Sequence, residues 1–279
     1  MRGALASQLL RAPAARWPLT LLGLILLLVL LGPLLSPWSF AEIDFDGAWQ
    51  SPPGLAGQHW FGTDALGRDL FVRTLEGGRL SLLVALVASL VSLAIGVVWG
   101  MLAGYLGGRI DALMMRSVDL LYALPFLFLV ILLLVLFGRH MALVLIAIGA
   151  VNWLDMARLV RGQTLSLKQR EFVLAARVAG LGPLAILRHH LLPHLLGLVL
   201  VTLTLTLPQV ILMESFLSFL GLGIQEPATS WGALINEGAR EMEVAPWSLL
   251  FPAGFLVLTL LCLNRLGDVA RDLLDPQTR

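Results

Sequence analysis

Charge, cysteine and lysine are all scarce in this sequence. Charged residues make up 13% of the 279 positions and hydrophobic residues 58%, with a mean hydropathy of +0.88, whereas about a quarter of a soluble domain is charged. The single cysteine, Cys262, excludes an internal disulfide and a cysteine-based metal cluster. The single lysine, Lys168, follows a leucine, so the chain has no Gly-Lys-Ser/Thr phosphate loop. The sequence therefore predicts an integral membrane protein that is not itself a P-loop ATPase.

Six long apolar runs predict six membrane-spanning helices, because about 20 apolar residues cross the hydrocarbon core of a bilayer. The predicted fold class is thus an all-α integral membrane protein. We divide the chain into residues 1–79, a five-helix core at residues 80–264 and a tail at residues 265–279. The predicted spans are Trp17–Leu35, Leu80–Leu106, Leu120–Phe137, Met141–Leu154 continuing towards Arg158, Leu195–Met213 and Trp247–Asn264.

The first apolar run has an alternative interpretation as a cleaved signal peptide. Three arginines and no acidic residue precede it, and the small triplet Ser39-Phe40-Ala41 follows it. The run is longer than the usual apolar core of a signal peptide, so we favour a retained span.

A seam of small residues follows one face of the second span. Ser92, Gly96, Gly100 and Gly104 recur at every fourth residue, and such seams let helices pack closely in lipid. The seam serves packing within this chain or against a partner protein, and we favour the first.

The distribution of arginine and lysine predicts the orientation of the chain. Six spans place both termini on one side of the membrane, and fourteen of the nineteen basic residues fall on that side, together with residues 161–194. Basic residues favour the cytoplasmic side. We therefore expect both termini and residues 161–194 in the cytoplasm, and the acidic segments 36–79 and 216–246 outside.

The long cytoplasmic segment predicts a docking element. Glu171–Ala179 has the apolar periodicity of a short helix, Gly180 is placed to end it with a left-handed cap, and Gly182-Pro183 begins a second helix. Small side chains at Ala175, Ala176 and Gly180 let another protein approach the backbone closely. The alternative is an amphipathic connector between two spans.

The first external segment contains the string His59–Leu82, whose glycine and aspartate residues suit tight turns. Arg68 and Asp69 are expected to pair with charges in this segment or on a partner. The residues of this external motif are Gly62, Thr63, Asp64, Gly67, Arg68 and Asp69.

Two of these motifs resemble those of ABC-importer permeases. Ala175-Ala176, Gly180 and Leu192-Pro193 are similar to the cytoplasmic loop through which that family docks on its ATPase. Leu174 occupies the position of the family's usual glutamate, and Glu171 lies one turn earlier. The string GTD-x-x-GRD before the second span is similar to the peptide/nickel branch of the family. The stretches that most resemble the C-type permeases of oligopeptide import systems are LDMARLVRGQTLSLKQREFVLAARVAG, SFLGLGIQEPATSWGAL and MEVAPWSLLFPAGFLV.

The resemblance implies a type I ABC-importer permease bundle in the bacterial cytoplasmic (inner) membrane, surrounded by lipid and forming half of a peptide pore. It implies a second homologous permease, two cytoplasmic ATP-binding subunits that hold ATP and Mg²⁺, and an extracytoplasmic peptide-binding protein. It implies no cofactor, metal or catalytic residue in this chain and no nucleic-acid partner. Oligopeptides are the expected cargo, with dipeptides, nickel chelates and cell-wall peptides as alternatives. The residues implied in ATPase coupling are Glu171, Ala175, Ala176, Arg177, Gly180 and Pro193.

Acidic residues beside apolar runs are functional candidates by default. Glu214 directly follows the fifth span and is our candidate for the transport path or its gate; the alternative is a place at the far interface or in a water cavity. Asp119 is expected to form a structural pair or a water contact at the edge of the third span, which Pro125 bends. We expect Asp155 near the interface, where an acid is less costly than at the bilayer centre.

Other functions find less support. His190 and His194 have the spacing of a zinc pair, but no acidic base lies between them and Pro193 interrupts the turn. We expect this basic cluster to contact phosphate, lipid headgroups or the ATPase instead. An intramembrane enzyme lacks a set of Ser, His and Asp that we can place on one side of the membrane. A membrane scaffold that only anchors a cytosolic partner is the alternative from a different class, and it would show no peptide-dependent ATP turnover.

Overall fold

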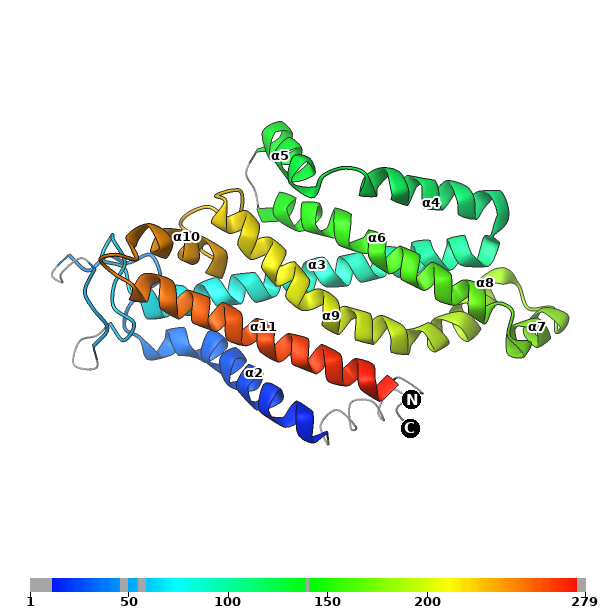
Figure 1. The fold of residues 1–279 in the computed structure, drawn as a ribbon, viewed down its shortest axis with the longest axis horizontal. Helices are drawn as coiled ribbons and strands as arrows, with labels where there is room; N and C mark the ends of the chain where they lie inside the picture. Colours follow the sequence, from blue (N-terminus) through cyan, green and yellow to red (C-terminus); the bar gives the residue numbers. More distant parts are fainter. Residues whose placement is uncertain (1–11, 46–49, 55–58, 139–140, 275–279) are drawn as a thin grey trace.

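The computed structural model describes residues 12–45, 50–54, 59–138 and 141–274, and these form a bundle of long helices (Figure 1). In these ranges extended backbone pairs only at two isolated bridges near the start of α3. The predicted all-α fold class is confirmed. The helices are α2 (Pro13–Leu31), η1 (Gly32–Leu35), α3 (Leu70–Leu106), α4 (Gly108–Tyr122), α5 (Phe126–Phe137), α6 (Met141–Leu167), α7 (Glu171–Val178), α8 (Pro183–Ile186), η2 (Leu187–Leu191), α9 (Leu192–Phe219), α10 (Trp231–Glu241) and α11 (Trp247–Leu274).

Five helical stretches are long and apolar enough to cross a membrane, and the pair α4 and α5 makes a sixth if its two halves are counted as one span. The predicted bend at Pro125 is confirmed, but it is sharp enough to divide the expected span Leu120–Phe137 into two helices: α4 ends at Tyr122, α5 begins at Phe126, and the two are bent by 81°. Pro125 explains the break, because proline has no N–H to continue the helix and disfavours helical backbone at the residue before it.

Several helices extend beyond the predicted apolar runs. α3 begins at Leu70 and not at Leu80, because the Asp69 side chain caps its first turn and accepts a hydrogen bond from the Val72 N–H at 2.8 Å. α11 likewise continues through the predicted tail to Leu274. The divisions after residues 79 and 264 therefore fall inside helices. The N-terminal arginines up to Arg11 lie outside the described residues.

The small-residue seam of α3 packs against α6. A Cβ atom added at Gly100 would lie 2.4 Å from the Ala157 carbonyl oxygen, and one at Gly104 would lie 2.8 Å from the Cβ of Thr164. Two backbones at this separation leave no room for a larger side chain. The interpretation of the seam as packing within the chain is confirmed.

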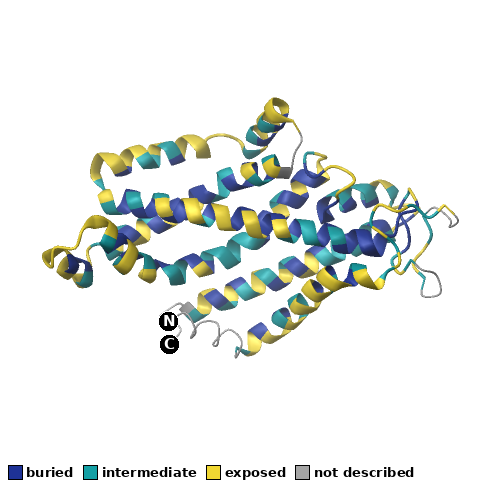
Figure 2. Cartoon of the chain, turned by 180° about the vertical axis from the view of Figure 1, so that it is seen from behind, coloured by how far each residue is buried: buried dark blue, intermediate teal, exposed yellow. Residues whose placement is uncertain are grey.

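The two ends of the bundle carry different elements (Figure 1). α7 and α8 lie at the end where α3 meets α4, and the start of α2 and the end of α11 point towards that same end. α10 and the loop before α3 lie at the opposite end. Much of the outer surface of the long helices is exposed (Figure 2), and it carries large apolar side chains such as Val135 and Phe137 of α5. Such a surface suits lipid or another apolar partner.

Candidate functional site

The predicted docking element forms a helix with a glycine cap. α7 starts at Glu171, whose negative charge suits a helix N-terminus, and carries Arg177 in its last turn. Gly180 has a φ of +80°. Its N–H donates to the Arg177 carbonyl at 2.9 Å, and the Leu181 N–H donates to the Ala176 carbonyl at 3.1 Å. These two bonds make a Schellman cap, so the predicted left-handed end at Gly180 is confirmed.

The two faces of α7 differ from the sequence prediction. Val173 and Ala176 are buried in a core cluster with residues of α3, α6 and α9. Leu174, Ala175 and Val178 are exposed, Val178 by 90%. The Ala176 side chain is therefore covered by this chain's own bundle, because a surface helix must bury one face to attach to it, and its part in ATPase coupling stays a prediction. The exposed face carries the Leu174 side chain and not that of Ala176.

The docking element runs from α7 to α8. Contacts on both of its sides attach it to the membrane-spanning helices. The guanidinium of Arg177 lies 5.2 Å from the centre of the Tyr105 ring near the end of α3. Phe172 stacks on His194 with 4.5 Å between ring centres. Lys168 Nζ donates to the Tyr105 carbonyl at 3.3 Å, where a positive charge suits the C-terminus of α3. Sequence patterns do not reveal these tethers, because they arise only when the chain folds back.

Pro193 lies exposed in the first turn of α9. Proline has no N–H to donate to the carbonyl group of the residue four positions earlier. The turn before it, Leu187–Leu191, is a π-helix. His194 Nδ1 lies 2.6 Å from the His190 carbonyl oxygen. Among the described residues, no third metal ligand stands with these two histidines. α8, η2 and α9 form one continuous helical stretch, so the docking element joins a span directly.

At the opposite end, Asp64 organises the turn before α3. Its carboxylate accepts hydrogen bonds from the N–H groups of Leu66 and Arg68, both at 2.9 Å, and from Arg68 Nε at 2.8 Å. Gly62 and Gly67 have φ values of +80° and +78°, the left-handed region that glycine adopts without strain. The expected tight turns and the pairing of Arg68 within the segment are both confirmed.

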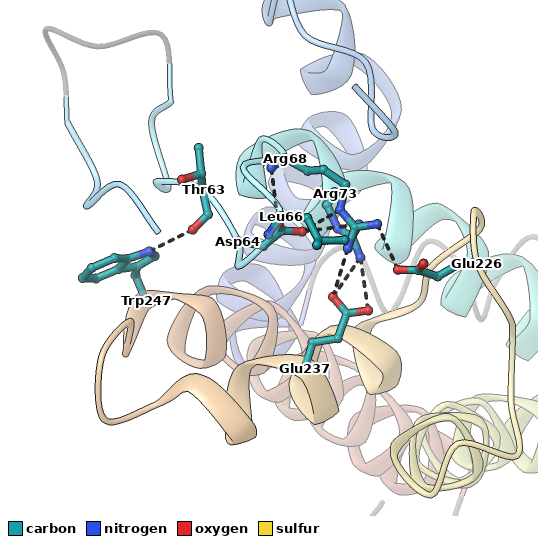
Figure 3. A network of polar contacts seen from close by, with 8 residues as sticks. All are labelled: Thr63, Asp64, Leu66, Arg68, Arg73, Glu226, Glu237 and Trp247. Atoms are coloured by element: carbon teal, nitrogen blue, oxygen red, sulfur yellow. Dashed lines mark hydrogen bonds and ion pairs between the residues drawn. The ribbon is translucent and has the colours of Figure 1, made fainter. Parts of the chain in front are cut away.

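The Asp64 carboxylate also belongs to an ion-pair network between the two external segments (Figure 3). Arg73 Nη1 lies 3.4 Å from Asp64, and Arg73 Nη2 lies 2.9 Å from Glu237. Arg68 Nη1 lies 2.9 Å from Glu226. Burial raises the pKa of Glu237, although Arg73 and Arg68 oppose the shift. The network fixes the start of α3 against α10 and the loop before it.

α10 is the element that sequence reasoning missed within residues 216–246. The Ser230 side chain caps it and accepts a hydrogen bond from the Ala233 N–H at 3.3 Å. Trp231, Leu234 and Gly238 are buried along one face. The signal was present in the sequence, because a serine cap followed by apolar or small residues at helical spacing predicts an amphipathic helix.

Asp69 has a second contact besides its cap on α3. Its Oδ2 lies 2.8 Å from His59 Nδ1, and His59 Nε2 lies 3.2 Å from Asp44 Oδ2. Burial raises the pKa of Asp69, although hydrogen bonds from the backbone and His59 oppose the shift.

The Thr63 carbonyl accepts a hydrogen bond from Trp247 Nε1 at 3.3 Å. Residues of the external motif thus help to hold this chain together, and their contact with a partner stays a prediction.

Glu214 is fully buried near the C-terminal end of α9. Its carboxylate accepts hydrogen bonds from Ser81 at 2.9 Å and Ser218 at 2.7 Å. The Ser81 hydroxyl in turn accepts one from the Trp231 N–H at 3.2 Å. Serines of α3 and α9 therefore satisfy Glu214 inside the chain, and its placement at the far interface stays a prediction. Its role in the path or gate stays a prediction.

Comparison with known proteins gives consistent results. A family model described as binding-protein-dependent transport system inner membrane component matches residues 96–279. The oligopeptide transport system permease protein OppC of Haemophilus influenzae is 51% identical over 96% of this chain and 86% of its own length. OppC of Escherichia coli (strain K12) is 53% identical, covering 95% and 88%. The dipeptide transport system permease protein DppC of Bacillus subtilis is 46% identical, covering 94% and 82%.

Proposed function

Because this chain belongs to the family of binding-protein-dependent transport system inner membrane components, we propose that it is the permease subunit of an ATP-driven importer whose cargo is oligopeptides. A permease subunit of a peptide importer is the function that its relatives support over nearly the whole chain. OppC of Haemophilus influenzae and of Escherichia coli are 51% and 53% identical, and OppC and DppC of Bacillus subtilis are 43% and 46% identical. The two higher values of these four belong to relatives with oligopeptide names, and this favours oligopeptides as cargo.

Coupling to an ATPase rests on one observation, the apolar surface of the docking element. Leu174, Val178 and Leu184 are exposed by 47%, 90% and 77%. An exposed apolar patch on a polar segment indicates a protein interface. The opposite face of α7 packs on α8 and η2 and belongs to a buried cluster that also contains residues of α3, α6 and α9. A displacement of α7 is therefore passed through packed side chains to α8 and η2, which continue directly into α9.

We place the docking element and both termini in the cytoplasm, because the basic residues are concentrated there. Two partner ATPases bind ATP and Mg²⁺ and draw together, and each moves the docking element of one permease. The two permeases then rock as rigid bodies between inward-facing and outward-facing states. The peptide passes between this chain and a second homologous permease, after an extracytoplasmic binding protein has delivered it to the end that holds α10.

Purification of the tagged chain in mild detergent, followed by reconstitution, tests this proposal. We expect a second permease and two P-loop ATPases to purify with it, and peptide-loaded binding protein to stimulate ATP hydrolysis in proteoliposomes. Stoichiometric recovery with another cytosolic protein and without an ATPase would support the membrane scaffold instead. A complete complex whose rate of ATP hydrolysis does not change with any peptide would contradict the assignment of oligopeptides as the cargo.

A further inference from the structure

A cluster of charged and polar side chains lies on the surface where α4 packs beside α6. The Tyr122 hydroxyl donates to Asp155 Oδ1 at 2.9 Å, and Arg158 Nη2 donates to Asp119 Oδ1 at 2.7 Å. The Arg158 guanidinium also lies 4.3 Å from the centre of the Tyr122 ring. We call these four residues the path cluster. They form one unit, because each contacts another member across the two helices.

The packing of α6 on α3 shows how deep the path cluster lies. A Cβ atom added at Gly96 would lie 2.8 Å from the Trp153 carbonyl and 2.6 Å from Met156 Cβ, so Asp155 is level with Gly96. Gly96 is roughly 24 Å from Leu80 and 15 Å from Leu106 along a helix that rises about 1.5 Å per residue. Asp155 therefore lies well inside both helices and not at their ends, and its distance from the membrane interface stays a prediction.

The side chains of the path cluster are open to the outside of this chain. Asp119 and Arg158 side chains are exposed by 64% and 42%, and Tyr122 is exposed by 47%. Charged groups within helices that cross a membrane face the inside of a helical assembly or a water-filled cavity, because exposure to lipid chains is costly. The same face of α6 continues towards the cytoplasmic end with exposed Gly162 and Ser166, which follow Asp155 at helical spacing.

We infer that this face of α4 and α6 borders the water-filled peptide path, and that the path cluster binds the charged ends of the peptide as it passes. The inference rests on the proposed function, since it names residues for a path that only a peptide permease has. The ligand is the α-ammonium group of a peptide at Asp155, and the α-carboxylate group at Arg158.

The charges of the cluster suit the α-ammonium end of the ligand. Asp155 uses one lone pair for the Tyr122 hydroxyl, and a carboxylate has about four acceptor positions, so it retains acceptors for an ammonium group. Two carboxylates and one guanidinium leave the cluster with an excess negative charge. Arg161, one turn further, does not cancel it, because Arg161 Nη2 is bonded to Asp111 at 2.7 Å.

Weak binding is what a transport path requires. Ion pairs that are open to water contribute little free energy, and a site along a path must release its ligand as readily as it takes it. The backbone ends are common to all peptides, so a site that reads them accepts cargo of varied sequence. Side-chain selectivity then rests with the binding protein.

Cysteine accessibility tests whether this face of α4 and α6 is in contact with water. In the complete reconstituted importer, Cys262→Ser removes the single cysteine of this chain, and Leu159→Cys places a thiol one turn after Asp155 at a position that is 42% exposed. Leu86→Cys on α3, where the exposure is 47%, is the control. We expect a water-soluble quaternary-ammonium methanethiosulfonate to modify the first thiol at least tenfold faster. Equal rates would overturn the inference.

Uptake tests the ligand. We expect Asp155→Asn to slow the uptake of radiolabelled tri-alanine five- to tenfold, and Asp155→Glu to retain more than half of it, with the partner permease recovered in equal amount. Unchanged uptake by the Asn variant, or loss of the partner permease from its complex, would overturn the assignment. If the wild-type importer moves no peptide, it is the proposed function that is wrong. Rapid modification of Leu159→Cys would then still show that this face of α4 and α6 is in contact with water.

Discussion

Arg73 and Glu237 join the first turn of α3 to α10 across 164 positions of sequence, with Arg73 Nη2 at 2.9 and 3.2 Å from the two carboxylate oxygens. The Arg73 side chain is 2% exposed and that of Glu237 is 35% exposed. The pair therefore fixes the end of the bundle that holds α10 through a buried cation. This end is also where we place the delivery of peptide.

Removal of the buried cation should destabilise the external end. Arg73→Ala removes the arginine nearest to Glu237 and leaves Arg68 as the remaining cation for Asp64 and Glu237. We expect a loss of about 1–3 kcal/mol in unfolding free energy. Arg240→Ala, an exposed arginine on the same helix as Glu237, is the control and should change little. Thermal unfolding in detergent, followed by tryptophan fluorescence, measures both. Equal melting temperatures for the two variants would show that the network contributes nothing.

The seam between α3 and α6 should reject any side chain larger than hydrogen. In Gly100→Leu the new Cβ meets the Ala157 carbonyl, which is backbone and cannot rotate away. Overpacking of this kind is destabilising by about 1–3 kcal/mol. Gly23→Leu on α2 is the matched control, because nothing lies within 4 Å of its Cβ position. We expect the yield of folded protein to fall for the first variant alone, and equal yields would contradict the close packing.

Arg79 should hold the end of α2 by replacing a backbone donor. Proline at position 33 has no N–H for the Val29 carbonyl, and Arg79 Nε donates to that oxygen at 2.7 Å. We expect Arg79→Ala to lower the melting temperature, and Pro33→Ala to recover part of the loss in the double variant by supplying an N–H. If Pro33→Ala changes the melting temperature equally with and without Arg79, the Arg79 side chain and the new backbone N–H do not share the Val29 carbonyl.

Most of the helical fold could be predicted from the sequence, because span length and hydropathy depend on local composition. The glycine cap at Gly180, the turns around Asp64 and the seam at Gly100 also follow from local backbone chemistry. The break at Pro125 was expected only as a bend, since one proline does not fix the angle between two helices. The face that α7 exposes and the depth of Asp155 depend on which helices pack together, and no local pattern contains that information.

Leu174 is a direct test of the chemistry of the docking surface. The family to which this chain is similar usually has glutamate there, and the Leu174 side chain is 47% exposed beside Val178. We expect Leu174→Glu to reduce the amount of ATPase that purifies with the chain, because a carboxylate without a partner is costly to bury in an apolar contact. Leu174→Met keeps the volume and polarity and should retain the ATPase. Equal recovery for both variants would show that the ATPase does not cover this side chain.

The most direct measurement of the central claim is ATP-dependent peptide uptake by proteoliposomes that contain Gly180→Trp. Gly221→Trp is its matched control, because Gly221 also has a positive φ, of +75°, and open space around its Cβ position, but it follows α9 at the external end. Both variants carry similar backbone strain and should insert into the membrane. We predict that Gly180→Trp abolishes uptake, because the indole occupies the docking surface, while Gly221→Trp retains it. Normal uptake by Gly180→Trp would contradict the docking role of α7 and its glycine cap.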